Sequence, residues 1–392
     1  MLMKSLLFYL LKLVNRLIPK NSNNIVFCSY PDYSDNPKYL YDYLITLHKY
    51  NLFWLVNDKA NITELNKLGI KNIYYKKSIK GILCFMKSKY FFSSHMNCFD
   101  FKVNSQKYFE LWHGIPLKRL MFRQNELPDK HKRSLSKRIQ NIDYFCSTSN
   151  LVSLIFAANF NLDVTKLIEV GYPRNDVLNK KNKNLNILFP DIKASTKVIL
   201  YCPTYRVWSE YKTNEGTPRE SIFGYGDLDN IKLEEMLEKY NAKILLKLHP
   251  FEEEYYIKQN IKLPNNVCIL TQKQLSKNGL TLYDVLNKMD GLITDYSSIY
   301  FDYLILDRPI IFNLYDKEQY DNSRGFNLTP LPHWLPGEII DNSADLLSAI
   351  EDVLLEDDST KEKRAELNKI FNENYNFDAS IHIEEIISKL NQ

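Results

Sequence analysis

The sequence has no C-x-x-C pair, and no cysteines or histidines lie at the spacing of a zinc site. It also contains neither G-x-G-x-x-G nor G-x-x-x-x-G-K-[ST], which argues against a standard dinucleotide dehydrogenase and a P-loop NTPase. A net charge of +4 without an Arg-rich block argues against a nucleic-acid partner. The cysteines are expected to be small, mostly buried apolar residues of a protein in a reducing compartment, and they are Cys28, Cys84, Cys98, Cys146, Cys202 and Cys268.

No uninterrupted apolar run at the N-terminus is long enough to cross a membrane, because Lys4, Lys12 and Arg16 interrupt residues 2–18. A small-residue cleavage site is missing as well, which argues against a secretory signal. The same residues nevertheless have the spacing of an amphipathic helix, which Pro19 would end.

The two halves of this helix differ sharply in polarity, and only Phe8 breaks the pattern. The apolar half contains Leu2, Met3, Leu6, Leu7, Leu10, Leu11, Leu13, Val14, Leu17 and Ile18. The polar half contains Lys4, Ser5, Tyr9, Lys12, Asn15 and Arg16. A basic amphipathic helix of this kind is typical of a peripheral protein on the anionic cytoplasmic face of the membrane. The alternative is a helix packed on the protein's own core or on a partner chain.

The rest of the chain alternates between strand-like and helix-like segments, and its 392 residues predict more than one domain. Strands are expected at 25–29, 52–56, 72–75, 90–93, 108–112, 142–147, 167–170, 198–202, 243–248, 266–270, 291–294 and 309–313. Helices are expected at 37–48, 151–158, 233–240, 282–288, 299–306, 344–354 and 360–371. The pattern predicts an α/β protein with two Rossmann-like domains, 21–190 and 191–392, after the helix of residues 1–20. Ligands of such domains bind beyond the carboxyl ends of the strands.

Two histidines follow predicted strands directly and are candidates for acid–base chemistry. His113 begins the segment His113-Gly114-Ile115-Pro116-Leu117-Lys118, and His249 stands before Pro250. A histidine can take a proton near neutral pH, and Gly114 and Lys118 add an approachable backbone and a cation. A strand-end histidine packed under a turn is the alternative for each.

A phosphate site is predicted where Ser297 and Ser298 precede the helix 299–306. Serine is a good helix N-cap, and a helix N-terminus attracts anions; simple capping is the alternative. Asp302 lies on the same helix face as Ser298. Arg206, Arg324 and the segment 171–176 are further candidates, since arginine clamps phosphate with paired hydrogen bonds.

No carboxylate cluster marks a metal site, and no cofactor is predicted. The D-x-D at Asp227 and Asp229 is interpreted as a surface turn.

Together, the segments WHGIPLK, GYPRND, PTYR, KLHP, TDYSSIYFDY and the Arg-Gly at residue 324 resemble the CDP-glycerol glycerophosphotransferase family of teichoic acid synthesis. The resemblance implies a GT-B fold, with the acceptor side in 21–190 and the donor side in 191–392. It implies a CDP-glycerol or CDP-ribitol donor and a polyprenyl-diphosphate-linked saccharide acceptor. His113 would be the base for the acceptor hydroxyl, and Gly114 and Lys118 would lie on the acceptor side. His249 would contact the donor diphosphate, and the further donor-binding residues would be Ser297, Ser298, Asp302, Arg324 and Arg206.

The length suits either a primase that adds one glycerol phosphate or a compact polymerase. The function we predict is that of a teichoic acid primase, which transfers glycerol phosphate and releases CMP. A teichoic acid or capsule polymerase is the first alternative. The second alternative is a GT-B glycosyltransferase that uses a nucleotide sugar. The third is a non-catalytic protein that binds at the membrane surface.

Overall fold

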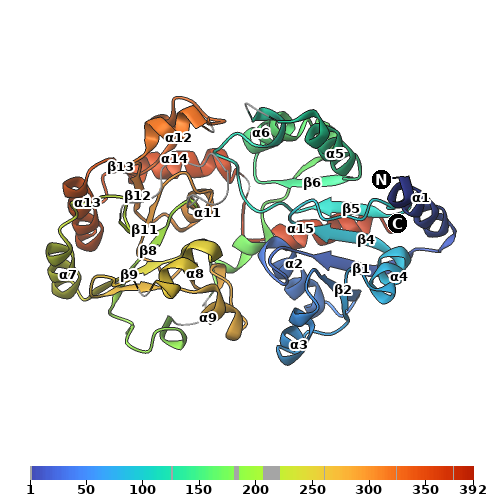
Figure 1. The fold of residues 1–392 in the computed structure, drawn as a ribbon, viewed down its shortest axis with the longest axis horizontal. Coiled ribbons are helices and arrows are strands. Elements are labelled where there is room, and N and C mark those ends of the chain that lie inside the picture. Colours follow the sequence, from blue (N-terminus) through green and yellow to red (C-terminus); the bar gives the residue numbers. More distant parts are fainter. Residues whose placement is uncertain are drawn as a thin grey trace. The chain divides into compact units, whose positions relative to one another are not determined.

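The chain forms two compact units (Figure 1). A computed structural model describes residues 2–124, 127–180, 185–205, 221–259, 261–323, 325–373 and 375–392. Unit 1 comprises Met1–His113, Met121–Val177 and Asn372–Gln392. Unit 2 comprises Gly114–Leu120 and Leu178–Phe371. The predicted assignment of an acceptor side to 21–190 and a donor side to 191–392 stays a prediction.

Unit 1 is built on a parallel sheet in the order β3-β2-β1-β4-β5-β6-β7. Its strands are β1 (Asn21–Cys28), β2 (Asn51–Val56), β3 (Ile73–Tyr75), β4 (Ser88–Ser93), β5 (Lys107–Glu110), β6 (Tyr144–Ser147) and β7 (Leu167–Glu169). Its α-helices are α1 (Leu2–Leu17), α2 (Asp35–Thr46), α3 (Ala60–Lys67), α4 (Ile79–Lys87), α5 (Asp129–Gln140), α6 (Asn150–Phe160) and α15 (Ala379–Lys389). The strands are apolar along most of their length because helices cover both faces of such a sheet. Trp54 lies in the core and stacks on Phe27 at 5.7 Å between ring centroids.

Unit 2 is built on a second parallel sheet, in the order β10-β9-β8-β11-β12-β13. Its strands are β8 (Lys197–Cys202), β9 (Ala242–Leu246), β10 (Val267–Ile269), β11 (Gly291–Thr294), β12 (Ile310–Asn313) and β13 (Glu338–Ile340). Its α-helices are α7 (Asn230–Lys239), α8 (Pro250–Lys258), α9 (Gln272–Lys277), α10 (Tyr283–Leu286), α11 (Ile299–Tyr303), α12 (Lys317–Ser323), α13 (Ser343–Leu355) and α14 (Lys361–Phe371).

The two strand orders share one plan. In each sheet the first strand of the chain is central, and the next two strands are added on one side of it. The chain then crosses back to the centre, and the remaining strands are added on the other side. The order reverses between β1 and β4 in unit 1 and between β8 and β11 in unit 2, which is where ligands of doubly wound sheets bind. The predicted α/β class with two parallel sheets is confirmed, as are the predicted strands. Strand β5 ends at Glu110, two residues before the predicted end, and β13 was not predicted.

The C-terminal helix α15 belongs to unit 1, although unit 2 precedes it in the chain. In Figure 1 it is the red helix among the blue and cyan elements. Ile383 and Ile387 of α15 are fully buried in the core of unit 1. The carboxylate of Asp176 accepts hydrogen bonds from the backbone N–H groups of Ala379 and Ser380 at 3.1 and 2.9 Å. Asp176 therefore fixes the start of α15 by satisfying donors that the first helical turn leaves free.

The predicted N-terminal helix is confirmed as α1, and its contacts explain the exception at Phe8. Phe8 lies 6.5 Å from Phe101 between ring centroids. Asn15, on the same face, is fully buried, and its Nδ2 donates to the Phe101 carbonyl and to Gln106 Oε1. The helix therefore packs on unit 1 through a narrow face that includes a polar residue.

Most of the described side chains in the apolar half of α1 are exposed, whereas Leu11 and Ile18 are half-buried. Its exposed members are Leu6, Leu7, Leu10, Leu13, Val14 and Leu17, the last with 84% of its surface exposed. Among the helices of the described residues, none combines the length and the hydropathy that crossing a membrane requires.

Candidate active site

The predicted base, His113, lies beyond the carboxyl end of β5 in unit 1. Strands β4 and β5 pair with Ser93 opposite Glu110, so the segments that follow them leave the sheet side by side. His113 Nδ1 lies 2.7 Å from the Ser94 carbonyl oxygen. A carbonyl can only accept, so Nδ1 carries the proton and Nε2 keeps its lone pair. This tautomer is the one that a general base requires.

Two aromatic rings contact the His113 imidazole. The His95 ring is stacked on it at 4.1 Å with an angle of 10° between the planes. The Trp112 ring lies 4.0 Å away. Burial lowers the pKa of His113, and burial together with the neighbouring His113 lowers the pKa of His95 to about 3. Both imidazoles are therefore neutral near pH 7, and His113 is free to take a proton.

Arg174 holds the chain at His113. Its Nη1 donates to the His113 carbonyl at 2.9 Å and to Asp35 Oδ1 at 2.8 Å, and its side chain is almost completely buried. Asn36 Oδ1 accepts from the Arg174 backbone N–H, and Asn36 Nδ2 donates to the Trp112 carbonyl. The segment 171–176, considered above as a phosphate clamp, thus contacts the backbone of the candidate site.

Glu110 is a buried acid of this site that the sequence analysis missed. Its Oε2 accepts from Met96 N and from the Ser93 hydroxyl, each at 2.8 Å, and its Oε1 accepts from Trp112 N at 3.1 Å. The Tyr108 hydroxyl donates to Oε2 as well. Burial raises the pKa of Glu110 to about 7. One carboxyl group thus connects the segment after β4 to the segment after β5.

The predicted phosphate site lies at the start of α11 in unit 2. Ser297 and Ser298 are partly exposed, and Ser298 occupies the N-cap position without a capping hydrogen bond from its side chain. Asp302, in contrast, is buried, and its Oδ2 accepts from the Tyr283 hydroxyl at 2.7 Å. The serines thus have the exposure that ligand binding requires, and the donor-binding role of Asp302 stays a prediction.

Strands β8 and β11 are tied together beside these serines. Asp295 Oδ1 accepts from the backbone N–H and the hydroxyl of Thr204 at 2.7 and 2.6 Å. The Thr294 hydroxyl donates to the Cys202 carbonyl at 2.8 Å. Residues 203–205 and 294–298 therefore meet at one sheet edge, and Asp295 and Thr204 form a support that the sequence analysis did not identify.

His249 lies at the same edge of unit 2, between β9 and α8. It is exposed, its carbonyl accepts the Glu253 N–H in the first turn of α8, and its ring lies 4.7 Å from that of Tyr205. Pro250 is the first residue of α8, a position that suits proline because no intrahelical donor is needed there. Because β8 pairs with both β9 and β11, His249 and the serines follow strands that end at one edge. Arg206 and Arg324 lie outside the described residues.

The segment after His113 belongs to unit 2 and packs beside the residues that follow position 324. Lys118 bridges to Phe326, and the Arg119 N–H donates to the Gly325 carbonyl at 3.1 Å. Asn327 Nδ2 donates to the carbonyls of Pro116 and Lys118. Two distant motifs thus meet in unit 2, whereas Gly114 and Lys118 were expected on the acceptor side. Their roles stay predictions.

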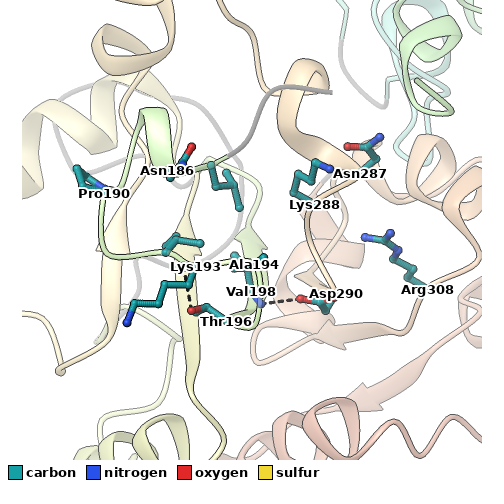
Figure 2. A pocket seen from close by; sticks show the side chains of 12 residues that line it. Asn186, Pro190, Lys193, Ala194, Thr196, Val198, Asn287, Lys288, Asp290 and Arg308 are labelled. Atoms are coloured by element: carbon teal, nitrogen blue, oxygen red, sulfur yellow. Dashed lines mark hydrogen bonds between the residues drawn. The ribbon is translucent and has the colours of Figure 1, made fainter. Parts of the chain in front are cut away.

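A pocket of about 500 Å³ in unit 2 lies elsewhere (Figure 2). Val198, near the start of β8, and Asp290, just before β11, line it. Lys193, Lys288 and Arg308 line it as well, and Asp290 Oδ2 accepts the Val198 N–H at 2.7 Å. The pocket is therefore at the amino ends of the strands, opposite to the edge that carries His249 and the serines.

The D-x-D segment has a local structural role in unit 2. Asp229 caps α7, and its Oδ1 accepts the Lys232 N–H at 3.1 Å. In the part of the chain that the structure describes, no group of three or more His, Cys, Asp or Glu residues could hold a metal ion.

Two doubly wound parallel sheets of this kind define a GT-B-like α/β protein. Residues 9–389 match the family described as CDP-Glycerol:Poly(glycerophosphate) glycerophosphotransferase. The chain belongs to this family, and the resemblance found in the motifs is confirmed.

Relatives named for teichoic acid synthesis match much of the chain. A teichoic acid poly(glycerol phosphate) polymerase of Bacillus spizizenii is 30% identical over 373 residues, covering 88% of each chain. A polymerase with the same name from Bacillus subtilis is 30% identical over 86% of this chain, which spans 44% of that longer protein. A teichoic acid ribitol-phosphate primase of Bacillus spizizenii is 29% identical over 54% of this chain and 50% of its own length.

Solved structures agree with the fold. A variant of the wall teichoic acid polymerase TagF soaked with CDPG has a TM-score of 0.76 and 28% identity, covering 94% of this chain and 89% of that one. A UDP-GlcNAc 2-epimerase from Neisseria meningitidis, bound to UDP-GlcNAc, has a TM-score of 0.53 and 15% identity over 93% of this chain and 99% of its own. The second likeness concerns the fold alone.

Proposed function

We propose that this enzyme is a teichoic acid polymerase that transfers glycerol phosphate or ribitol phosphate from a CDP-linked donor to a lipid-linked acceptor. The family match and the mutual coverage with a poly(glycerol phosphate) polymerase support the proposal. The matched primase covers only about half of the chain, so the comparisons support the polymerase alternative better than the primase-like function that was predicted first.

The observation that carries the chemistry is the contact of His113 Nδ1 with the Ser94 carbonyl at 2.7 Å, which leaves Nε2 with its lone pair. Burial lowers the pKa of His113, which favours the same neutral tautomer. In the proposed step, the acceptor hydroxyl oxygen attacks the phosphorus next to the polyol and forms a new P–O bond. His113 Nε2 takes the hydroxyl proton. The P–O bond to CMP breaks, and CMP leaves with that electron pair. His249, Ser297 and Ser298 are the described residues that we assign to the donor diphosphate, whose charge dominates the barrier of phosphoryl transfer.

The donor can be tested directly. The protein is incubated with CDP-glycerol, CDP-ribitol or a panel of nucleotide sugars, together with a lipid-diphosphate disaccharide analogue. We expect CMP release with a CDP-polyol and a ladder of products that differ by one polyol phosphate in mass. A single added unit would favour the primase, and sugar transfer without turnover of either CDP-polyol would refute the proposal.

We also propose that α1 docks on an anionic membrane surface, where the lipid-linked acceptor resides. Its exposed leucines would enter the interface, and Arg16 is placed for contact with headgroups. The alternative, in which α1 packs on the protein's own core, applies to the face with Phe8 and Asn15. Those contacts leave most of the apolar half of α1 exposed.

Replacing Leu6 and Leu10 by glutamate is expected to weaken binding to phosphatidylglycerol vesicles by about tenfold or more, because two apolar side chains no longer enter the lipid. Leu6 and Leu10 expose 60% and 50% of their surface. Binding is measured by co-sedimentation. Ile231→Glu, at an exposed position on α7, is the matched control and should bind as the unchanged protein does. Equal binding by the double variant would contradict the docking of α1.

A further inference from the structure

The stacked pair of His95 and His113 is more constrained than two neighbouring strand ends require. The rings are nearly parallel at 4.1 Å, and each is tied to Ser94. The Ser94 carbonyl accepts from His113 Nδ1 at 2.7 Å, and the Ser94 hydroxyl lies 2.8 Å from His95 Nδ1. One residue thus sets the rotation of both imidazoles.

The backbone beneath the stack is fixed from the core. The Glu110 carboxyl group accepts hydrogen bonds from the backbone N–H groups of Met96 and Trp112. Met96 directly follows His95, and Trp112 directly precedes His113. The Arg174 Nη1 donates to the His113 carbonyl on the other side of the peptide. The spacing of the two rings therefore depends on a buried carboxyl group and a buried guanidinium rather than on surface loops.

Among the described residues, Asp35 and Arg174 are the charged groups that act on both histidines of the pair. The carboxylate of Asp35 favours protonation of both histidines, and the Arg174 guanidinium opposes it. Tyr30 places its ring edge-on to His95 at 6.0 Å. Burial is the largest effect on the pKa of each histidine, and the His95 ring is one of the groups that cover His113.

We propose that His95 is a positioning residue for the transfer reaction, because its ring fixes the plane of the His113 imidazole and keeps water from the part of the ring that it covers. The inference rests on the proposed role of His113 as the base. A misdirected base loses rate steeply, since a displacement of about 1 Å can cost about 100-fold. A base open to water is also protonated at a higher pH.

The test compares His95→Ala with His95→Phe in the full-length protein. His95→Ala should lower kcat by about 10- to 100-fold and leave the KM for the CDP-polyol unchanged. It should also move the acid limb of the kcat/KM profile to higher pH, because water restores the pKa of His113 toward its ordinary value. His95→Phe keeps a flat ring, so its kcat and the pH of the acid limb of its kcat/KM profile should match those of the unchanged protein. His131→Ala, at an exposed position of α5, is the control.

The outcomes separate this inference from the function on which it rests. If His113→Ala keeps turnover, the base assignment fails. If His113→Ala loses turnover while His95→Ala matches the unchanged protein in kcat and pH profile, the base stands and the role of His95 is refuted. The role of His95 would also be refuted if His95→Phe lost as much kcat as His95→Ala while both variants unfolded at the same temperature as the unchanged protein.

Discussion

Replacing His113 with alanine is expected to lower kcat for CMP release by about 10²- to 10⁴-fold, the usual contribution of a general base. Binding of the CDP-polyol should persist, because the residues assigned to the donor belong to unit 2. The expected loss reflects the single unprotonated nitrogen that His113 offers, since its Nδ1 is engaged by Ser94. Turnover is measured by CMP release, and donor binding by calorimetry.

The matched control is again His131→Ala, which removes an exposed imidazole from α5. The control should retain full turnover. A His113→Ala protein with near-normal kcat would remove the base assignment, whereas loss of donor binding in this variant would show that His113 acts on the donor instead.

Replacing Arg174 with alanine is expected to lower the free energy of unfolding by about 3–5 kcal/mol, the usual cost of removing one partner of a buried ion pair. Asp35 would lose its partner at 2.8 Å, and the His113 carbonyl would lose a donor. Turnover should fall as well, because the backbone that presents the base is no longer held. Urea denaturation gives the stability, and CMP release gives the activity.

Lys67→Ala is the control for that experiment. Lys67 pairs with Glu64 at 2.9 Å, but both side chains are about two-thirds exposed. Exposed pairs contribute about 0–1 kcal/mol, so the control should be nearly as stable as the unchanged protein. A loss in Arg174→Ala no greater than in Lys67→Ala would contradict the importance of the buried pair.

The strands could be predicted because each is a short apolar run that depends on local sequence. Strand β11 at Gly291–Thr294 was predicted at its observed bounds. Helix α15 was not predicted, because its partners are far away in the chain. Asp176 caps it from about 200 residues earlier, and Ile383 and Ile387 fill the core of unit 1 only after the chain returns.

The residues of the candidate site were predicted where a histidine or serine follows a strand. They were missed where their role depends on contacts with residues distant in the sequence. His95 follows the predicted strand 90–93 just as His113 follows 108–112, so the same signal was present in the sequence. Glu110 lies within the predicted strand 108–112, and nothing in its local sequence indicates a partner. Its four donors come from the segments around β4 and β5, and only the register of these strands brings them together.

The path of the chain between the units has a consequence for dissecting this enzyme. Gly114–Leu120 is part of unit 2 although unit 1 continues on both sides of it, and Asn372–Gln392 returns to unit 1. A fragment cut at residue 177 would therefore carry a segment that has lost its partners at Gly325–Asn327, and it would lack the helix that buries Ile383 and Ile387. Neither half can be obtained by a single truncation, so isolated-domain studies would require circular permutation or insertion of α15 after residue 177.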